Sequence, residues 1–380
     1  MTRPVNRPVK NRPSGEPLRV GIVGCGNISA TYLKAAQLFE RLLVVAVADL
    51  DAQRAQARAS EFEVRAEPVE VLLADPEVEA VINLTVPNVH AQVSRQVLEA
   101  GKHVYSEKPL ATKREEGREL LELAVELDLR VGCAPDTFLG GGLQTARKLL
   151  DDGWIGKPVA AAAFMMSSGV EMWHPDPAFF YRPGAGPLFD MGPYYLTALI
   201  SFLGPMKSVM GSAATSFEER RITSKPYSGQ MLQVETPTHI TALLEFHSGA
   251  VATLITSFDV QASELPRMEI YGSQGTLSVP DPNTFGGPLR IRRSGIKEWS
   301  EVPLTHGYVT NSRGLGLADM AHALASGRRH RANGEMAFHV LDVMESTLEA
   351  ARQGCRIELS SSCEQPAPLP LGLAEGLLDD

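Results

Sequence analysis

Short, continuously apolar runs alternate with amphipathic stretches over the first third of the chain. The apolar runs are residues 18–23, 42–48, 80–85, 103–107 and 130–134. Stretches with apolar residues at helical spacing lie between them, at residues 28–39, 52–61, 89–100 and 112–127. Strands that are apolar on both faces and joined by helices form parallel sheets covered on both sides. We therefore predict a doubly wound, Rossmann-type α/β domain over residues 18–135.

The pattern changes after residue 135. One helix is predicted over residues 143–151, and two late helices over 316–325 and 335–352. Apolar runs follow one another in between, several of them separated by only a few turn residues, at 158–166, 239–246, 250–258, 267–272 and 275–279. Short turns between strands favour hairpins. We therefore predict a C-terminal α+β domain over residues 136–360 with a mostly antiparallel, open sheet.

Both ends of the chain differ in composition from the two domains. Residues 1–17 are basic and rich in proline, and residues 361–380 begin with a segment rich in serine and proline. Such segments bury little apolar surface to offset their conformational entropy. We expect a flexible N-terminal arm and a loose C-terminal tail.

The net charge and the spacing of the cysteines argue against binding of nucleic acid, anionic membranes or a metal ion. The chain has 36 basic and 45 acidic residues, a net charge of −9, which offers no surface for nucleic acid or an anionic membrane. Its four cysteines are scattered and lack metal-ligand spacing, which fits a reducing compartment. No apolar run approaches the roughly 20 residues that a membrane-spanning helix needs. We expect a soluble, cytoplasmic protein with no metal site.

A glycine-rich turn follows the first predicted strand and opens the first predicted helix. It reads Gly24-x-Gly26-x-x-Ser29, with serine where a third glycine often stands. Gly24 permits the tight turn, and Gly26 lets the backbone approach the pyrophosphate of a dinucleotide at the helix N-terminus. The turn residues assigned to the cofactor are Gly24, Gly26, Asn27 and Ile28.

An aspartate ends the second predicted strand, where an acidic residue in a Rossmann domain binds the adenosine ribose. Asp49 is followed by Leu50 and Asp51, so no arginine directly follows it that could bind a 2′-phosphate. This pattern favours NAD over NADP. The alternative is an aspartate that only caps the next helix.

Two further strand ends carry polar residues at the edge of the sheet where cofactors bind. They are the segments 85–90 and 107–109, and their assigned cofactor contacts are Thr85, Pro87, Asn88, His90, Glu107 and Lys108. Next to a nicotinamide, Lys108 is able to bond a substrate hydroxyl and stabilise the alkoxide formed during hydride transfer. The alternative is a structural salt bridge.

At these segments the chain resembles the glucose–fructose oxidoreductase / inositol dehydrogenase / rhizopine-catabolism (Gfo/Idh/MocA) family. The matching pieces are GIVGCGNIS, the strand end at Asp49, TVPNVH and AGKHVYSEKPLA. The resemblance implies a Rossmann domain, a C-terminal open-sheet domain, a nicotinamide cofactor and a sugar, cyclitol or related polyol as substrate. It also implies a homo-oligomer, either a dimer or a tetramer.

The family's second catalytic motif is an aspartate followed four residues later by a histidine. Asp190 matches, but Tyr194 stands at the histidine position. A tyrosine is a poor base at neutral pH unless a cation lowers its pKa. Three proton acceptors therefore stay open: Tyr194 assisted by Lys108, Lys108 itself, or His174 as a replacement. The catalytic assignment is Lys108, Asp190 and Tyr194.

Aromatic and hydrogen-bonding residues gather just upstream, in the segment EMWHPDPAFFYRPGAG. Sugar sites often combine aromatic faces with hydrogen-bond donors, so this segment is predicted to form a pocket loop. Asp136, at the end of the last Rossmann strand, is expected to face the same cleft. The assigned substrate contacts are Lys108, Asp136, Trp173, His174, Arg182, Asp190 and Tyr194.

Together these features predict an NAD(P)-dependent oxidoreductase that acts on a secondary alcohol or ketone of a sugar, cyclitol or related polyol. Two other classes fit the same fold. One is a glycoside hydrolase or lyase that retains NAD and oxidises the sugar transiently. The other is a non-enzymatic sensor of nucleotide or sugar.

Overall fold

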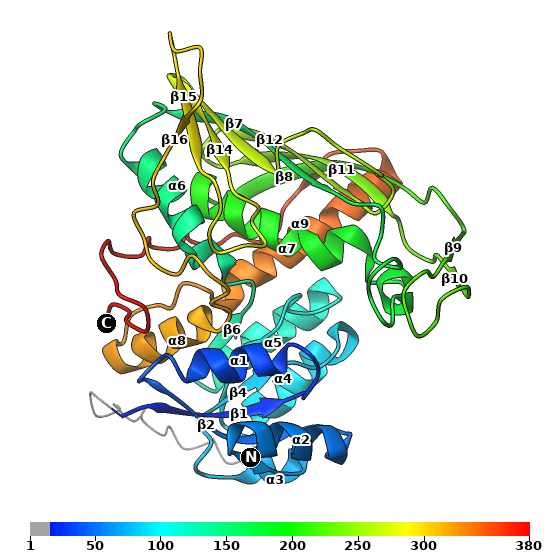
Figure 1. Cartoon of the computed structure of the whole chain (residues 1–380), viewed down its shortest axis with the longest axis vertical. Coiled ribbons are helices and arrows are strands. Elements are labelled where there is room, and N and C mark those ends of the chain that lie inside the picture. Colours follow the sequence, from blue (N-terminus) through cyan, green and yellow to red (C-terminus); the bar gives the residue numbers. More distant parts are fainter. Residues whose placement is uncertain (1–15) are drawn as a thin grey trace.

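The chain folds into two sheets with a layer of helices between them, as Figure 1 shows for the computed structural model. The structure describes residues 16–380, so residues 1–15 of the predicted arm lie outside the described residues. Within residues 16–380, no helix is long and apolar enough to cross a membrane. Within the same range, no group of three or more His, Cys, Asp or Glu side chains is placed to hold a metal ion.

The N-terminal sheet has six parallel strands in the order β3-β2-β1-β4-β5-β6. The strands are β1 (Leu18–Val23), β2 (Leu42–Ala48), β3 (Arg65–Ala66), β4 (Ala80–Asn83), β5 (His103–Ser106) and β6 (Val131–Cys133). The helices are α1 (Ser29–Ala36), α2 (Ala52–Phe62), α3 (Val69–Ala74), α4 (His90–Glu99) and α5 (Arg114–Glu126). This order confirms the predicted Rossmann-type sheet. The short β3 and α3 were not predicted, because two and six residues are too few to show a period.

The C-terminal sheet has nine strands in the order β16-β15-β14-β13-β7-β12-β11-β8-β17. Its long strands are β7 (Pro158–Met166), β8 (Met206–Ala214), β11 (His239–Phe246), β12 (Val251–Ser257), β13 (Met268–Gly272) and β14 (Gly275–Val279). Its short strands are β15 (Arg290–Arg293) and the two edge strands β16 (Ser300–Glu301) and β17 (Ile357–Glu358), and β9 (Glu219–Arg221) pairs with β10 (Met231–Gln233) in a separate hairpin. Every pairing in the large sheet is antiparallel except β7 with β12, which confirms the predicted mostly antiparallel sheet.

Three helices of the C-terminal part lie between the two sheets in Figure 1: α6 (Gly141–Asp151), α7 (Gly186–Leu203) and α9 (Gly334–Gln353). Helix α7 packs on β7 and β12, while α9 packs on β8 and on α5 of the Rossmann domain. A fourth helix, α8 (Leu315–Ser326), contacts β6. The opposite face of the nine-stranded sheet has no helix on it in Figure 1.

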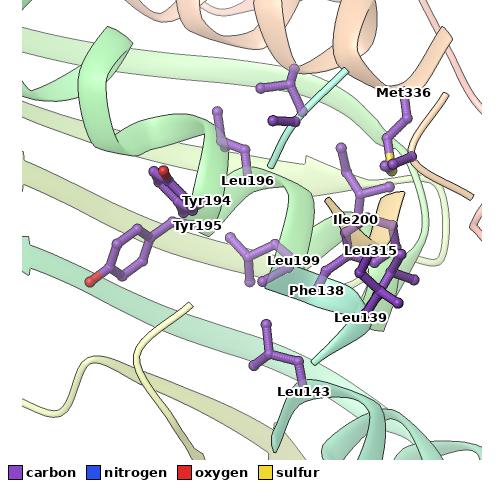
Figure 2. Packing of buried hydrophobic residues seen from close by; sticks show 14 of the residues in the cluster. Phe138, Leu139, Leu143, Tyr194, Tyr195, Leu196, Leu199, Ile200, Leu315 and Met336 are labelled. Carbon is purple, nitrogen blue, oxygen red and sulfur yellow. The ribbon is translucent and has the colours of Figure 1, made fainter. Parts of the chain in front are cut away.

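Helix α7 was not predicted. It is apolar nearly all round and contains Pro193, and both features hide a helical period. Burial on nearly every side explains the pattern, since α7 forms the centre of the core. Figure 2 shows Leu199 and Ile200 of this helix close to Phe138, which follows the last Rossmann strand by a few residues.

The C-terminal tail is packed against the body, contrary to the expected loose segment. Leu369 and Leu378 are buried. Asp379 pairs with Arg331 at 2.6 Å, and the final residue, Asp380, contacts Arg41 of the Rossmann domain at 3.0 Å. Two buried leucines and these ion pairs hold a segment whose composition alone suggests disorder.

Candidate active site

The glycine turn has the backbone that a dinucleotide requires. Gly24 has a φ of 103°, and a Cβ on this residue would lie 2.6 Å from the carbonyl of Leu84 on the neighbouring strand. A Cβ on Gly26 would meet nothing within 4 Å, so that side of the turn is open. Helix α1 begins at Ser29, directly after the exposed Asn27 and half-buried Ile28. The free N–H groups of this helix end are suited to bind a phosphate group.

Asp49 lies beside this turn. Its carboxylate accepts hydrogen bonds from the backbone N–H of Cys25 at 2.7 Å and of Asp51 at 2.8 Å. The helix cap of α2 is Asp51, whose side chain accepts from the N–H groups of Gln53 and Arg54. Asp49 itself is therefore held at the glycine turn, and its remaining lone pairs are free to accept ribose hydroxyls.

Arg58 on α2 was missed by the sequence reasoning. Its Nε donates to the hydroxyl of Ser29 at 3.0 Å, which places a cation at the start of α1. The signal was weak, because one arginine in an Ala- and Arg-rich helix looks like a solvent-exposed residue.

The segment after β4 also differs in part from expectation. Thr85 and Pro87 are half-buried and Asn88 is exposed, whereas the ring of His90 is buried. The two ring nitrogens of His90 face the carbonyl oxygens of Pro109 at 2.7 Å and Thr85 at 2.9 Å. Burial lowers the pKa of His90, and the two carbonyl contacts oppose that fall. The ring lies between two strand ends. His90 is 1% exposed, so its side chain is not presented at the surface as the expected cofactor contact would require.

Lys108 is held in place by a residue of the C-terminal domain. Its Nζ donates to the backbone carbonyl of Asp190 at 2.5 Å and to Asp190 Oδ1 at 2.9 Å. Glu107, the preceding residue, accepts the hydroxyl of Tyr32 at 2.9 Å and the backbone N–H of Lys108 at 3.1 Å. Two of the predicted catalytic residues, Lys108 from the Rossmann part and Asp190 from the C-terminal part, thus form one ion pair.

The charges around Lys108 determine its protonation. Burial by itself lowers the pKa of Lys108, but the negative charges of Asp190, Tyr194 and Glu107 outweigh burial and raise it above its ordinary value. Lys108 is therefore an ammonium ion at neutral pH. In that state it donates hydrogen bonds, and its raised pKa makes it a weaker acid than an ordinary lysine.

Tyr194 presents its ring face to this ammonium, with Lys108 Nζ 5.1 Å from the ring centroid. Burial raises the pKa of Tyr194, and the cations Lys108 and Arg313 reduce that rise. Arg313 is anchored by the side-chain oxygens of Asn283 at 2.8 Å and Asn311 at 2.9 Å. Sequence reasoning missed Arg313, because its loop carries no periodic or motif signal.

A cavity of about 350 Å³ opens beside the Lys108–Asp190 pair. Its polar lining residues are Asn88, Lys108, Thr112, Asp176, Arg182 and Asp190, and Phe179 and Phe180 form an aromatic wall. The cavity therefore brings together residues from both strand ends, from α7 and from the aromatic loop. Tyr194 is not among the residues that line it.

Asp136 is turned into the protein. It is 1% exposed, and its Oδ2 accepts the backbone N–H of Gly314 at 2.8 Å and of Gly316 at 3.0 Å. Burial raises its pKa to about 6. The structure thus places Asp136 under the loop that carries Arg313, and not in the cavity where a substrate contact was expected.

His174 and Trp173 lie at the outer side of the aromatic loop. The ring of His174 packs edge-on against Trp173, Phe179 and Phe180, and its Nδ1 accepts the backbone N–H of Asp176 at 3.1 Å. Trp173 is 66% exposed. Neither residue lines the cavity at Lys108, so the structure does not bring His174 to the ion pair.

Comparison with known proteins gives the family. Residues 18–134 match the family described as "Oxidoreductase family, NAD-binding Rossmann fold", and residues 143–278 match the GFO/IDH/MocA C-terminal domain.

Two curated relatives and one solved structure illustrate the likeness. D-glucoside 3-dehydrogenase of Escherichia coli is 31% identical over 69% of this chain and 76% of its own length. The dTDP-3,4-didehydro-2,6-dideoxy-alpha-D-glucose 3-reductase of Saccharopolyspora spinosa is 29% identical over 76% of this chain and 83% of its own. A levoglucosan dehydrogenase, solved with NADH, superposes with a TM-score of 0.79 at 18% identity over 91% of this chain and all of that one.

Both domains thus match the same family, in the order in which the family carries them, and the glycine turn and the Lys108 strand end fall inside the first match. This chain belongs to the Gfo/Idh/MocA family of NAD-binding oxidoreductases.

Proposed function

We propose that this protein transfers a hydride between NAD and a secondary alcohol or ketone of a sugar or related polyol. The observation that carries the proposal is the Lys108–Asp190 ion pair at a cavity that also contacts Asn88 of the cofactor edge. The sugar relatives support the substrate class. The site has no feature that favours the glycoside-cleaving or sensor alternatives.

The residues of the Rossmann edge fit a nicotinamide dinucleotide. The open side of Gly26 and the start of α1 would hold the pyrophosphate, and Asp49 would accept the ribose hydroxyls. A negative charge at Asp49 repels a 2′-phosphate, so we propose NAD as the preferred cofactor over NADP. When bound, the nicotinamide supplies or accepts the hydride.

In this proposal Lys108 is the residue that donates and accepts the proton. Its Nζ lines the cavity, whereas Tyr194 is 8% exposed and offers its ring face to the ammonium. Because the pKa of Lys108 is raised, the ammonium donates a proton to the oxygen of a ketone during reduction at neutral pH. In the direction of oxidation the amine accepts the hydroxyl proton, which requires alkaline pH. Asp190 orients Lys108, and the ring of Tyr194 stabilises its charge.

The test compares Lys108→Met with Lys108→Arg. We expect NAD-linked turnover of a sugar or polyol by the wild type and a loss of 10²- to 10⁴-fold in kcat in both variants, the range for a general acid–base group. Arginine keeps the positive charge but does not release its proton. Recovery of activity in Lys108→Arg would show that charge alone is needed and would contradict the proton assignment. Binding of NAD, measured by calorimetry, is the control and is expected to change little.

We also propose that the protein forms a homodimer or homotetramer through the helix-free face of the nine-stranded sheet. That face carries exposed apolar side chains on adjacent strands, Met210, Leu243 and Val251. Light scattering after size-exclusion chromatography tests this, and a monomer at micromolar concentration would contradict it. A cytoplasmic location stays a prediction from cysteine usage.

A further inference from the structure

A second cavity adjoins the one at Lys108. It measures about 330 Å³ and shares Asp176 and Arg182 with the first cavity. Both volumes fall at the low end of the roughly 300–1,000 Å³ typical of small-ligand sites. The second cavity lies between the aromatic loop and the β9–β10 hairpin, which stand together at one end of the molecule in Figure 1.

Most polar side chains that line the second cavity have no hydrogen-bond partner in the described part of the chain; the exception is Gln233, whose amide donates to Glu219 at 2.5 Å. Within residues 16–380, the side chains of Asp176, Arg182, Tyr227, Gln230 and Glu235 make no hydrogen bond or ion pair with one another or with the rest of the chain. They combine acceptors, donors and one aromatic ring that is 42% exposed. The set is therefore able to bond several hydroxyl groups of one ligand at once.

The walls of this cavity are fixed by buried charges. Arg220 at the base of the hairpin pairs with Glu171 at 2.7 Å and with Asp259, and the three side chains are 7–9% exposed. The backbone N–H of Glu235 donates to the carbonyl of Tyr181 at 2.8 Å, which ties the hairpin to the aromatic loop. A cavity held in this way loses little conformational entropy when a ligand binds.

The charges of the cavity identify the chemistry of the ligand. The charged side chains that line the cavity are two carboxylates, Asp176 and Glu235, and one guanidinium, Arg182. A phosphate or a carboxylate would be repelled by this excess negative charge. A neutral sugar suits it, because carboxylates and amides bond neighbouring hydroxyls and the ring of Tyr227 is able to pack on a C–H face.

We propose that this cavity is a second subsite for a neutral sugar unit, so that the substrate is a glycoside of at least two units. The unit that is oxidised or reduced lies at Lys108, and the next unit lies between Tyr227 and Arg182. The proposal rests on the proposed function for the role of the Lys108 cavity. It adds a preference for substrates of two sugar units, which a site for a single sugar would lack.

Calorimetry on the wild-type protein saturated with NADH tests the subsite without turnover. Three disaccharides are compared with the methyl glycoside of the same non-reducing unit: cellobiose with methyl β-D-glucoside, maltose with methyl α-D-glucoside, and lactose with methyl β-D-galactoside. In at least one pair we expect the disaccharide to bind tenfold or more tightly than its methyl glycoside. Tyr227→Ala and Gln230→Ala should each reduce this advantage about 3- to 10-fold, as expected for one lost contact.

The control is Gln353→Ala, which removes an exposed glutamine at the end of α9. It should keep the full advantage of the disaccharide. Equal affinities in all three pairs, no binding in any pair, or an advantage that survives both Tyr227→Ala and Gln230→Ala would overturn the subsite. Turnover assays with NAD separate the two proposals. Turnover of methyl glycosides without a disaccharide advantage removes the subsite alone, and disaccharide binding without any turnover removes the proposed function alone.

Discussion

Replacing Asp190 by asparagine should move the pH dependence of the reaction. Asp190 is the strongest of the groups that raise the pKa of Lys108, and burial of Lys108 acts in the opposite direction. Asparagine keeps the size of the side chain and the backbone carbonyl that Lys108 Nζ contacts at 2.5 Å, but removes the negative charge. Burial then dominates, so the pKa of Lys108 falls.

The distance between the two charges sets the size of the effect. Opposite unit charges 2.9 Å apart interact by about 6 kcal/mol at an effective dielectric constant of about 20. Since one pKa unit corresponds to about 1.4 kcal/mol, this is an upper limit of about 4 units. Water entry and the remaining carbonyl contact reduce it, and we expect a shift of about 2 units or more.

The assay is the kcat of sugar oxidation with NAD, measured from pH 6 to pH 11. In the wild type, kcat should rise with pH to the alkaline end, because the amine form of Lys108 is scarce below it. In Asp190→Asn the rise in kcat for oxidation should occur at least 2 pH units lower. The kcat for reduction with NADH should fall off with rising pH at a pH that is lower by the same amount. Asp176→Asn is the matched control, since Asp176 lines the same cavity without contacting Lys108. An unchanged profile in a folded Asp190→Asn protein would refute the assignment of the proton to Lys108.

Three other predictions follow from single contacts. Tyr194→Phe keeps the ring over the ammonium, so kcat should fall less than about tenfold in steady-state assays, whereas a loss beyond 10³-fold would make the phenol the proton carrier. Asp49→Ser should lower the ratio of kcat/KM for NAD to that for NADP at least tenfold, and Asp51→Ser, which removes a carboxylate but keeps a helix-capping oxygen, should leave that ratio unchanged. Burial lowers the pKa of His330 from 6.5 to about 4, so the unfolded chain binds a proton in this window and the folded chain does not. The contribution of His330 to the free energy of unfolding should therefore drop by about 3 kcal/mol between pH 6.5 and pH 4, and urea titrations of His330→Gln should show a drop that is shallower by about this amount.

Local sequence patterns were enough to predict the Rossmann half and the sheet edge at which a cofactor binds. Strands buried on both faces must be continuously apolar, and residues at their carboxyl ends must meet at one edge of a parallel sheet. For that reason Gly24, Asp49 and Lys108 were recognisable from local pattern alone. The antiparallel sheet was predicted for a similar reason, since short turns leave little choice of topology.

Which groups lie together depends on how the two halves of the chain pack. Asp190 and Lys108 are 82 residues apart, and the pKa of Lys108 depends on a balance between burial and neighbouring charges that no local pattern contains. Helix α7 has no visible period because it is buried nearly all round, and the tail is held by contacts with residues far away in the chain. Asp136 looked like a ligand contact by position, yet it bonds the loop of Arg313. Position along the chain fixes the edge of the sheet at which a side chain lies, but the packing of the second domain decides whether that side chain meets solvent, substrate or another charge.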